Sequence, residues 1–319
     1  MPVQSLPKWK LLTALAVLGY LSLVNQIIHV RPDHVFIAFF IFACLFGKES
    51  ARRFLIDWAP FILFWVAYDL MRGLVDNWRG AIHIREIYEY ERLLTGWFTH
   101  EILPFRLQWF SALHDGRWYK EALDLVCANL YSFHFFIPLT IGWLFWHTVD
   151  DRRLFYRFVW TLTVCNAMAL VTFFLYPAAP PWYVYLYGFQ PPGPELYGAA
   201  GALINIDRMI DLNFMTTLWD NFNANHFAAV PSLHGAYPVA VGWLCWKKFH
   251  RFRWVCIGYP AMVWFAAMYL NHHYLLDLLI GLIYLLVAFA VTDRLLLPHI
   301  FNKRLRPAVA TIREKPELR

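Results

Sequence analysis

Apolar runs long enough to cross a bilayer recur along this chain of 319 residues. A helix needs roughly 20 consecutive apolar residues to cross the hydrocarbon core. The chain offers eight candidates, at about 11–30, 34–47, 54–74, 124–147, 156–176, 233–247, 253–271 and 275–296. Because lipid offers no hydrogen-bond partner to the backbone, spanning segments without barrel periodicity must be helices. The sequence therefore predicts an all-α, polytopic membrane bundle with about eight spans.

The composition excludes other classes of protein. Hydrophobic residues make up 60% of the chain and charged residues only 16%, so a soluble domain is not expected. All five cysteines lie inside apolar runs without Cys-x-x-Cys spacing, which indicates buried thiols and neither a metal site nor a disulfide framework. No carboxylate cluster suits a metal either, and we expect no cofactor. The net charge of +6 does not indicate a nucleic-acid partner, because most of the basic residues lie in short loops and the tail.

The basic residues also predict an orientation. If the N-terminus is cytoplasmic, eight spans return the C-terminus to the cytoplasm, and the basic residues of the short segments gather on that side. The first run is then a retained helix and not a cleaved signal peptide. This arrangement places His234, His273 and the Pro-rich turn at 177–181 on the outer face. Short loops and the lack of sorting signals favour a bacterial inner membrane.

The chain divides into three parts by character. Residues 1–120 hold the N-terminal spans and interfacial helices, residues 121–297 a catalytic transmembrane core, and residues 298–319 a basic cytoplasmic tail. Within the first part, Glu86, Glu89 and Glu91 alternate with apolar and aromatic residues, a pattern typical of helices that lie in the membrane interface. Such helices form either a structural collar or a platform that guides lipid headgroups.

Two motifs place ionisable groups at the mouths of apolar runs. Residues 231–234 (Pro-Ser-Leu-His) open the sixth run, and residues 271–277 (Asn-His-His-Tyr-Leu-Leu-Asp) bridge the last two. Ionisable groups beside hydrocarbon are costly, and they usually have partners and a function. If Asp277 begins a helix, His273 lies one turn away, where the carboxylate can fix the tautomer of the imidazole. His234 can then act as general acid and base, and the set suits attack by His273 on phosphorus.

Further residues near these motifs are expected to contact the substrate. They are Ser232, Pro180, Pro181, Trp182, Tyr183, Asp207, Arg208, Asn271, His272 and Tyr274.

Each of these residues also has a simpler interpretation. The prolines of the 177–183 turn end a helix as well as form a pocket wall. Asp207 and Arg208 form either a solvated pair or a grip on polar substrate groups. His272 is a second candidate nucleophile, although its separation of five residues from Asp277 suits a helix less well. His134 in the fourth run is expected to make an interhelical hydrogen bond.

In this combination and order, the motifs resemble the membrane-bound type 2 phosphatidic acid phosphatase (PAP2) superfamily. The Pro-Ala-Ala-Pro-Pro-Trp-Tyr turn, the Ile-Asp at 206–207, Pro-Ser-Leu-His and His-His-Tyr-x-x-Asp are similar to the inositol phosphorylceramide synthases and their bacterial relatives. The resemblance covers about residues 143–297, with a weaker echo at 91–96. It implies a six-helix core with His234, His273 and Asp277 as the catalytic residues.

The chain also departs from the superfamily's lipid phosphatases. Their Arg six residues before the nucleophilic His is Ala267 here, and their first motif, a Lys followed by Arg-Pro, is missing near Pro177. Cations suit a phosphomonoester dianion more than a diester monoanion, so their absence favours transfer. Asn205 stands where the synthases tend to have Arg, and Arg208 is a candidate replacement.

The resemblance implies that the chain moves inositol phosphate from phosphatidylinositol to a ceramide-like lipid or a sugar hydroxyl through a phosphohistidine. The implied partners are phosphatidylinositol, a hydroxyl-bearing acceptor and the bilayer. One alternative is a phosphatase that hydrolyses a polyprenyl or diacylglycerol phosphate at the outer face. Another is a non-catalytic lipid-binding or transport protein, although such a protein has no need of His234, His273 and Asp277.

Overall fold

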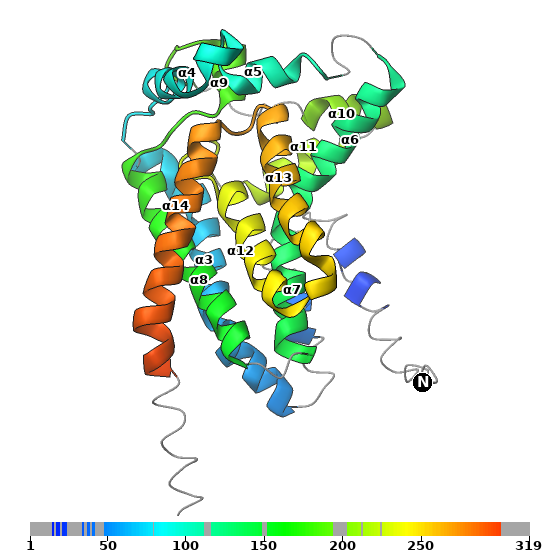
Figure 1. Cartoon of the computed structure of the whole chain (residues 1–319), viewed down its shortest axis with the longest axis vertical. Coiled ribbons are helices and arrows are strands. Elements are labelled where there is room, and N and C mark those ends of the chain that lie inside the picture. The colour runs from blue at the N-terminus through cyan, green and yellow to red at the C-terminus, as the bar shows by residue number, and fades with distance from the viewer. Residues whose placement is uncertain are drawn as a thin grey trace, which may run out of the picture.

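The computed structural model describes residues 15, 17–19, 21–23, 34, 37–38, 40–41, 48–78, 80–111, 116–148, 152–193, 203–211, 213–223 and 225–300. Within these ranges the regular elements are helices, as predicted (Figure 1). In chain order they are α3 (Lys48–Trp78), α4 (Arg85–Thr99), α5 (Leu103–Gln108), α6 (Trp118–Ser132), η1 (Phe133–Phe135), α7 (Phe136–Thr148), α8 (Arg152–Leu175), α9 (Pro181–Tyr187), α10 (Leu203–Ile210), α11 (Phe214–Phe222), α12 (Leu233–Lys248), η2 (His250–Phe252), α13 (Arg253–Tyr269), α14 (Leu275–Val291) and η3 (Thr292–Leu296).

Among the described residues, four helical segments are long and apolar enough to cross a membrane. They are Ala51–Met71, Trp118–His147, Arg152–Leu175 and Leu275–Ile300. The predicted spans at 54–74, 124–147, 156–176 and 275–296 fall within or across these segments. Helices α12 and α13, with 16 and 17 residues, stand beside them in the bundle. The predicted spans at 11–30 and 34–47 lie mostly outside the described residues. The chain is an integral membrane protein.

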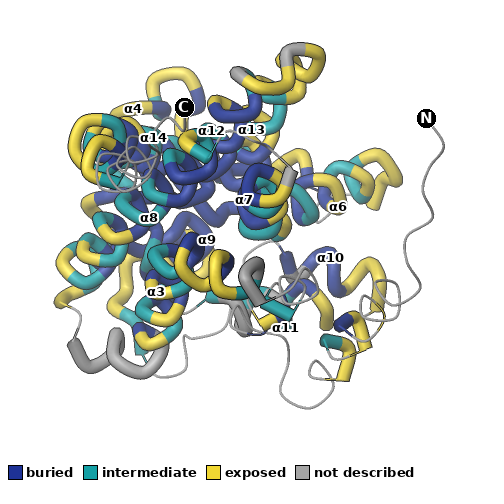
Figure 2. The backbone as a smooth tube through the Cα atoms, turned by 90° about the horizontal axis from the view of Figure 1, so that it is seen from below, coloured by how far each residue is buried: buried dark blue, intermediate teal, exposed yellow. Residues whose placement is uncertain are grey.

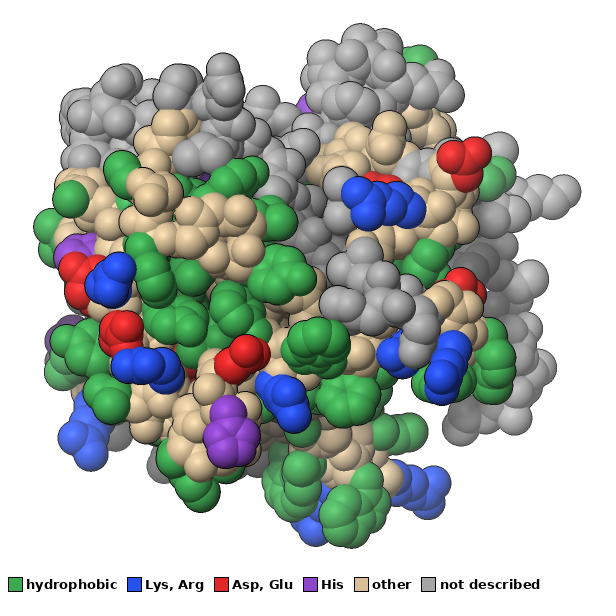
Figure 3. Space-filling model, turned by 90° about the horizontal axis from the view of Figure 1, so that it is seen from above, with side chains coloured by type: hydrophobic (Ala, Val, Ile, Leu, Met, Phe, Trp, Pro, Cys, Tyr) green, Lys and Arg blue, Asp and Glu red, His purple; other side chains and the backbone are tan. Residues whose placement is uncertain are grey.

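Short helices cover one end of the bundle. Helices α4, α5 and α9 lie across this end, and α10 and α11 lie beside them (Figure 1). The buried face of α4 carries Ile87, Glu91, Thr95 and Thr99, while its opposite face exposes apolar side chains such as Trp97, which is 79% exposed. Seen from this side, the surface mixes apolar and charged side chains (Figure 3). Such amphipathic helices match the predicted interfacial segment.

The centre of the bundle is filled by aromatic side chains. Buried stretches gather in its middle, between the long helices (Figure 2). Rings of α3 pack in sequence along the helix, and Trp58 also meets Phe155 of α8 at a centroid distance of 5.6 Å. At the end opposite the short helices, the buried carboxylate of Asp57 accepts hydrogen bonds from Trp146, Arg152 and Tyr156. These contacts fix α3, α7 and α8 relative to one another.

Glycines allow α12 and α14 to touch at the covered end. A Cβ on Gly281 would lie 2.0 Å from the carbonyl oxygen of Ser232, and a Cβ on Gly235 would lie 2.4 Å from that of Leu278. The amide of Ser232 donates to the carbonyl of Asp277 at 3.0 Å. Small residues bring membrane helices into backbone contact, so the two helix starts form one unit.

This contact gives the first testable prediction. We expect Gly281→Ala to destabilise the protein by about 3 kcal/mol or more, because the added methyl group meets a backbone atom that has no room to move. Gly258→Ala in α13 is the matched control, since its Cβ meets nothing within 4 Å and a helical Gly→Ala change gains up to about 1 kcal/mol. Unfolding of the detergent-solubilised variants measures the difference. Equal stabilities would contradict the close crossing.

Candidate active site

The candidate site lies where α12 begins and the turn from α13 to α14 passes over it. Ser232 is the N-cap of α12, and its hydroxyl accepts the amide N–H of Gly235 at 3.3 Å. Serine at this position satisfies one of the free amide groups of a helix start. His234, two residues into the helix, is thereby placed at the covered end of the bundle.

The turn between α13 and α14 is held by backbone hydrogen bonds. The carbonyl of Ala267 accepts the amides of both His272 and His273, at 3.0 and 3.1 Å. Asn271 adopts a left-handed conformation with φ 60°, which asparagine tolerates better than most residues. Its side-chain amide donates to Gln108 of α5. The position of the two histidines is therefore set by the turn itself.

The structure brings the three predicted catalytic residues together. His273 Nδ1 lies 3.1 Å from Asp277 Oδ2, and His273 Nε2 lies 3.0 Å from His234 Nδ1. Since a carboxylate only accepts, Nδ1 of His273 carries its proton and Nε2 has a free lone pair. His234 then donates from Nδ1 to that nitrogen. This is the tautomer of His273 that can act as a nucleophile.

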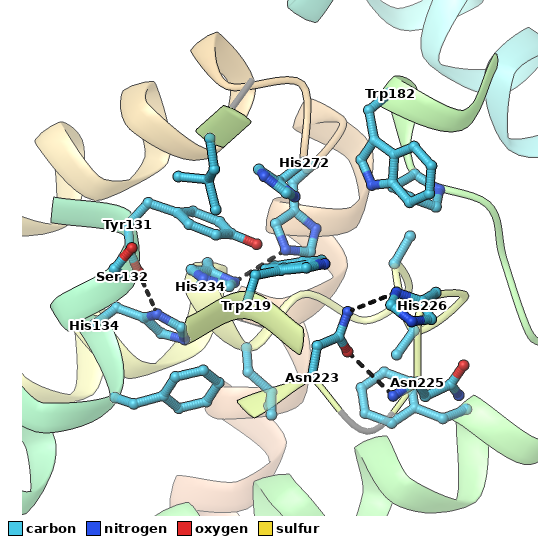
Figure 4. Close-up of a pocket in the computed structure, with 18 of the residues that line it drawn as sticks. Tyr131, Ser132, His134, Trp182, Trp219, Asn223, Asn225, His226, His234 and His272 are labelled. Atoms are coloured by element: carbon cyan, nitrogen blue, oxygen red, sulfur yellow. Dashed lines mark hydrogen bonds between the residues drawn. The ribbon is translucent and has the colours of Figure 1, made fainter. Parts of the chain in front are cut away.

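Aromatic rings pack against the histidines of the site (Figure 4). The ring of Tyr131 stacks on His234 at 4.0 Å and on His272 at 4.5 Å. Trp219 packs against His272 at 4.4 Å and lies 6.0 Å from Tyr131. Stacking of this kind restricts each imidazole to one plane, so the rings keep the geometry while the polar atoms remain available.

His134 also lies in this cluster, 3.4 Å from His234 between ring centroids. The prediction that His134 makes an interhelical hydrogen bond is wrong. Its Nδ1 instead meets the carbonyl of Tyr131, one turn earlier in the same segment, at 2.6 Å. Its buried Nε2 has no hydrogen-bond partner among the residues that the structure describes, and the residue lines the pocket.

The histidines line one side of a pocket with about 850 Å³ of empty space. Asn223, Asn225 and His226 lie on the other side (Figure 4), and apolar residues such as Phe136 and Phe173 complete the walls. Of the described residues that line the pocket, none is Lys or Arg. The pocket is thus rich in neutral donors and acceptors.

The predicted contact residues fall into two groups. Pro180, Trp182 and His272 line the pocket. The others near the motifs are buried and do not line it; they are Pro181, Tyr183, Ser232, Asn271 and Tyr274. The backbone N–H of Trp182 donates to the carbonyl of Asn271 at 2.8 Å. The Pro-rich turn therefore both ends α8 and holds the histidine turn in place.

Asp207 and Arg208 are placed differently from the prediction, and neither lines the pocket. The buried Asp207 carboxylate accepts the amides of Met215 at 2.7 Å and Thr216 at 2.8 Å, and the Thr216 hydroxyl at 2.6 Å. It caps the start of α11, the helix that carries Trp219. Arg208 is exposed to solvent. The solvated-pair interpretation is wrong for Asp207, because its partners belong to the helix that follows.

Sequence reasoning missed Tyr131, Trp219 and the role of Glu91. Glu91 is fully buried, and its Oε2 accepts the amide of Leu276 at 3.0 Å. Burial raises the pKa of this carboxyl to about 7, against the lowering effect of the Leu276 N–H and with a further rise from Asp277. Two signals were available: the position of Tyr131 one turn before His134, and the weaker family echo at residues 91–96, which begins at Glu91.

The chain is similar to known proteins over most of its length. A model described as the PAP2 superfamily matches residues 105–291. The phosphoinositol dihydroceramide synthase of Bacteroides thetaiotaomicron is 28% identical over 283 residues, which cover 86% of this chain and 88% of that protein. The catalytic subunit of inositol phosphorylceramide synthase of Saccharomyces cerevisiae is 28% identical over 285 residues, 88% of this chain and 67% of that protein. No solved structure matches the chain significantly.

The cap on α11 can be tested separately from catalysis. We expect Asp207→Ala to lower the free energy of unfolding by about 1–2 kcal/mol, the usual cost of a lost N-cap. Arg208→Ala should leave it within about 0.5 kcal/mol, as for surface changes in general. Unfolding of both purified variants is the measurement. If Arg208→Ala were the more harmful change, the assignment of Asp207 as a cap would be wrong.

Proposed function

The chain belongs to the PAP2 superfamily, and from this premise we propose that it is a membrane enzyme that transfers phosphoinositol. The donor is phosphatidylinositol and the acceptor is the hydroxyl of a ceramide-like lipid. The observation that carries the proposal is the continuous chain from Asp277 through His273 to His234 at the pocket wall. The synthase named after dihydroceramide in Bacteroides supports a sphingolipid acceptor.

In the first step, the Nε2 lone pair of His273 attacks the phosphorus of the donor. The bond between phosphorus and the diacylglycerol oxygen breaks. His234, which enters this step protonated on both ring nitrogens, gives that oxygen its Nδ1 proton and becomes neutral. Asp277 keeps the Nδ1 proton of His273 in place and stabilises the positive charge on the ring. The product is a phosphoinositol group on His273 and free diacylglycerol.

In the second step, His234 takes the proton of the acceptor hydroxyl. The acceptor oxygen attacks the phosphorus, the phosphorus–nitrogen bond breaks, and His273 regains its free lone pair. Because diacylglycerol leaves before the acceptor reacts, the kinetics are ping-pong. A phosphodiester carries one negative charge, and this supports transfer in a pocket whose described walls hold histidines and amides without Lys or Arg.

The proposal includes an arrangement in the membrane. About eight spans place both termini in the cytoplasm and the pocket at the outer face of a bacterial inner membrane. The amphipathic α4 at the same end as the site, with an exposed face of aromatic and apolar side chains, supports this placement. Residues 1–120, 121–297 and 298–319 then serve as the entry and collar segment, the catalytic core and the inner-leaflet tail.

Transfer of label tests the function. Purified protein in micelles is given phosphatidylinositol with a labelled inositol, first alone and then with ceramide. We expect label in a new lipid only when ceramide is present, and none with His273→Ala. His299→Ala is the matched control, since this exposed histidine lies at the far end of the chain's last helical segment.

Other outcomes would change the assignment. Label released only as water-soluble inositol phosphate would make the protein a hydrolase. Full activity of His273→Ala would remove the proposed nucleophile. If neither wild type nor His299→Ala acted on phosphatidylinositol, the proposed donor would be wrong.

Asp277 sets the tautomer of His273, so Asp277→Asn should change that tautomer. The amide can present its NH₂ group to Nδ1 of His273, which moves the ring proton to Nε2 and occupies the nucleophilic lone pair. We expect kcat to fall by about 10³- to 10⁴-fold, as for the corresponding change in a serine protease triad. The control is Asp293→Asn in the same helical segment, where the carboxylate pairs with Arg157. Equal losses in both variants would indicate a structural effect only.

A further inference from the structure

The helix that carries Asp277 has no cap of its own. Its N-cap residue, Tyr274, makes no side-chain capping bond. The first amides of a helix lack partners within the helix and must find them elsewhere. The amide of Leu276 finds one in Glu91 of α4, which is 185 residues away in sequence.

Glu91 is held in turn by its own surroundings. Its Oε1 accepts the hydroxyl of Thr95 at 3.4 Å, and that hydroxyl accepts the amide of Leu103, the first residue of α5. The carboxylate is fully buried between the covering helices and the start of α14. Both ends of the contact are thus fixed.

We propose that Glu91 is a positioning residue whose carboxylate caps the first turn of α14 and so holds Asp277 in the place from which it orients His273. This inference rests on the proposed transfer reaction. Leu276 directly precedes Asp277, so any movement of its amide moves the catalytic carboxylate. On the opposite side, the carbonyl of Asp277 accepts the amide of Ser232 at 3.0 Å. The first turn of α14 is therefore held between α4 and the start of α12.

The ionisation of Glu91 gives this contact a measurable signature. Burial is the main cause that raises its pKa to about 7. Asp277 faces it from α14, and its charge raises the pKa further. Other ionisable groups lie on the elements around Glu91. They are Tyr274 in the turn before α14, the exposed Arg106 of α5, and Glu89 of α4, which is paired with Arg92. A buried carboxylate that is costly to ionise is typical of a functional position.

The charged form is the better cap, because an anion interacts favourably with the positive end of a helix. Glu91 is ionised above about pH 7 and protonated below it. We therefore expect the ionised form to be the one that holds Asp277 best. The contribution should be lost as the pH falls through this value.

Three variants test the proposal by transfer from phosphatidylinositol to ceramide. Glu91→Gln keeps the shape and an acceptor oxygen but has no charge. We expect the ratio of wild-type to Gln-variant kcat to be near one below about pH 6 and to rise to about 3- to 10-fold above about pH 8, the worth of one helix-end charge. Both proteins have the same histidines, so the effect of histidine titration on kcat cancels in this ratio. Glu89→Gln is the control and should give a flat ratio, because this half-buried residue of α4 pairs with Arg92 and not with α14.

Glu91→Ala removes the cap altogether. We expect kcat to fall by about 10- to 100-fold with little change in KM, the usual effect of a small misplacement of catalytic groups. A flat pH ratio for Glu91→Gln, or a wild-type kcat for Glu91→Ala, would overturn the proposal.

Two readouts separate this inference from the proposed function and from misfolding. Nitrogen-15 spectra of histidine-labelled protein report the tautomer of His273 whatever the substrate is. They should show a single tautomer in wild type and a mixture in Glu91→Ala, and an unchanged signal would overturn the inference even if wild type transferred no inositol.

The second readout is stability. The pKa of Glu91 is 4.5 in the unfolded chain and about 7 in the folded protein. Between these two pH values Glu91 is therefore protonated in the folded protein and ionised in the unfolded chain. Wild type therefore loses stability as the pH rises through that window. Glu91→Gln lacks this titration, so the side chain at position 91 should cause no such loss of stability in the variant through the same window. Loss of activity in the variant above that pH then comes from misplacement and not from unfolding.

Discussion

The hydrogen bond between Asp277 and His273 is the interaction on which the rest of this structure depends. A buried ionisable group at a membrane helix end is costly unless it is paired, and Asp277 is fully buried. Its Oδ2 is paired with His273, while its Oδ1 has no hydrogen-bond partner among the described residues. The segment around it is held from three directions: the turn after α13 supplies His273, α12 bonds to the backbone of Asp277, and α4 bonds to the residue before it. The catalytic geometry is therefore a result of how the helix ends meet.

Backbone contacts do most of this positioning. Gly281 and Gly235 let α12 and α14 approach until their backbones touch, and the carbonyl of Ala267 sets both histidines. Backbone groups have no rotamers to fix, so they hold a site with little further loss of entropy. The position where the lipid phosphatases carry Arg is here occupied by Ala267, whose carbonyl orients the turn and whose side chain brings no charge.

The lining of the pocket fits the lipid phosphodiester that we propose as the donor. Its described walls combine aromatic rings, imidazoles and amides, without Lys or Arg. Rings such as Tyr131 and Trp219 pack on the imidazoles of His234 and His272 and restrict their orientation. A shielded pocket favours a lipid hydroxyl over water as the acceptor, because water has to enter the apolar surroundings to compete.

Much of this arrangement could be predicted from the sequence. Apolar length predicted the helical bundle, and a spacing of four residues predicted the Asp277–His273 contact, because such signals are local. Asp207 as a cap, His134 beside His234 and Glu91 on Leu276 could not be read in the same way. The His134 and Glu91 contacts depend on where distant segments meet, and the Glu91 contact joins residues 185 positions apart. The Asp207 cap reaches across eight and nine residues, which is farther than the spacing of one helical turn. The Pro-rich turn was predicted as a wall or as a helix end, and it is both.

The stereochemical course at phosphorus tests the central claim most directly. The substrate is phosphatidylinositol made chiral at phosphorus with oxygen isotopes, and the configuration of the phosphoinositol product is determined. Transfer through a phosphohistidine on His273 requires two in-line displacements, each of which inverts the centre. We predict retention of configuration. Inversion would show that the acceptor attacks the donor directly, and the role assigned to His273 would be contradicted.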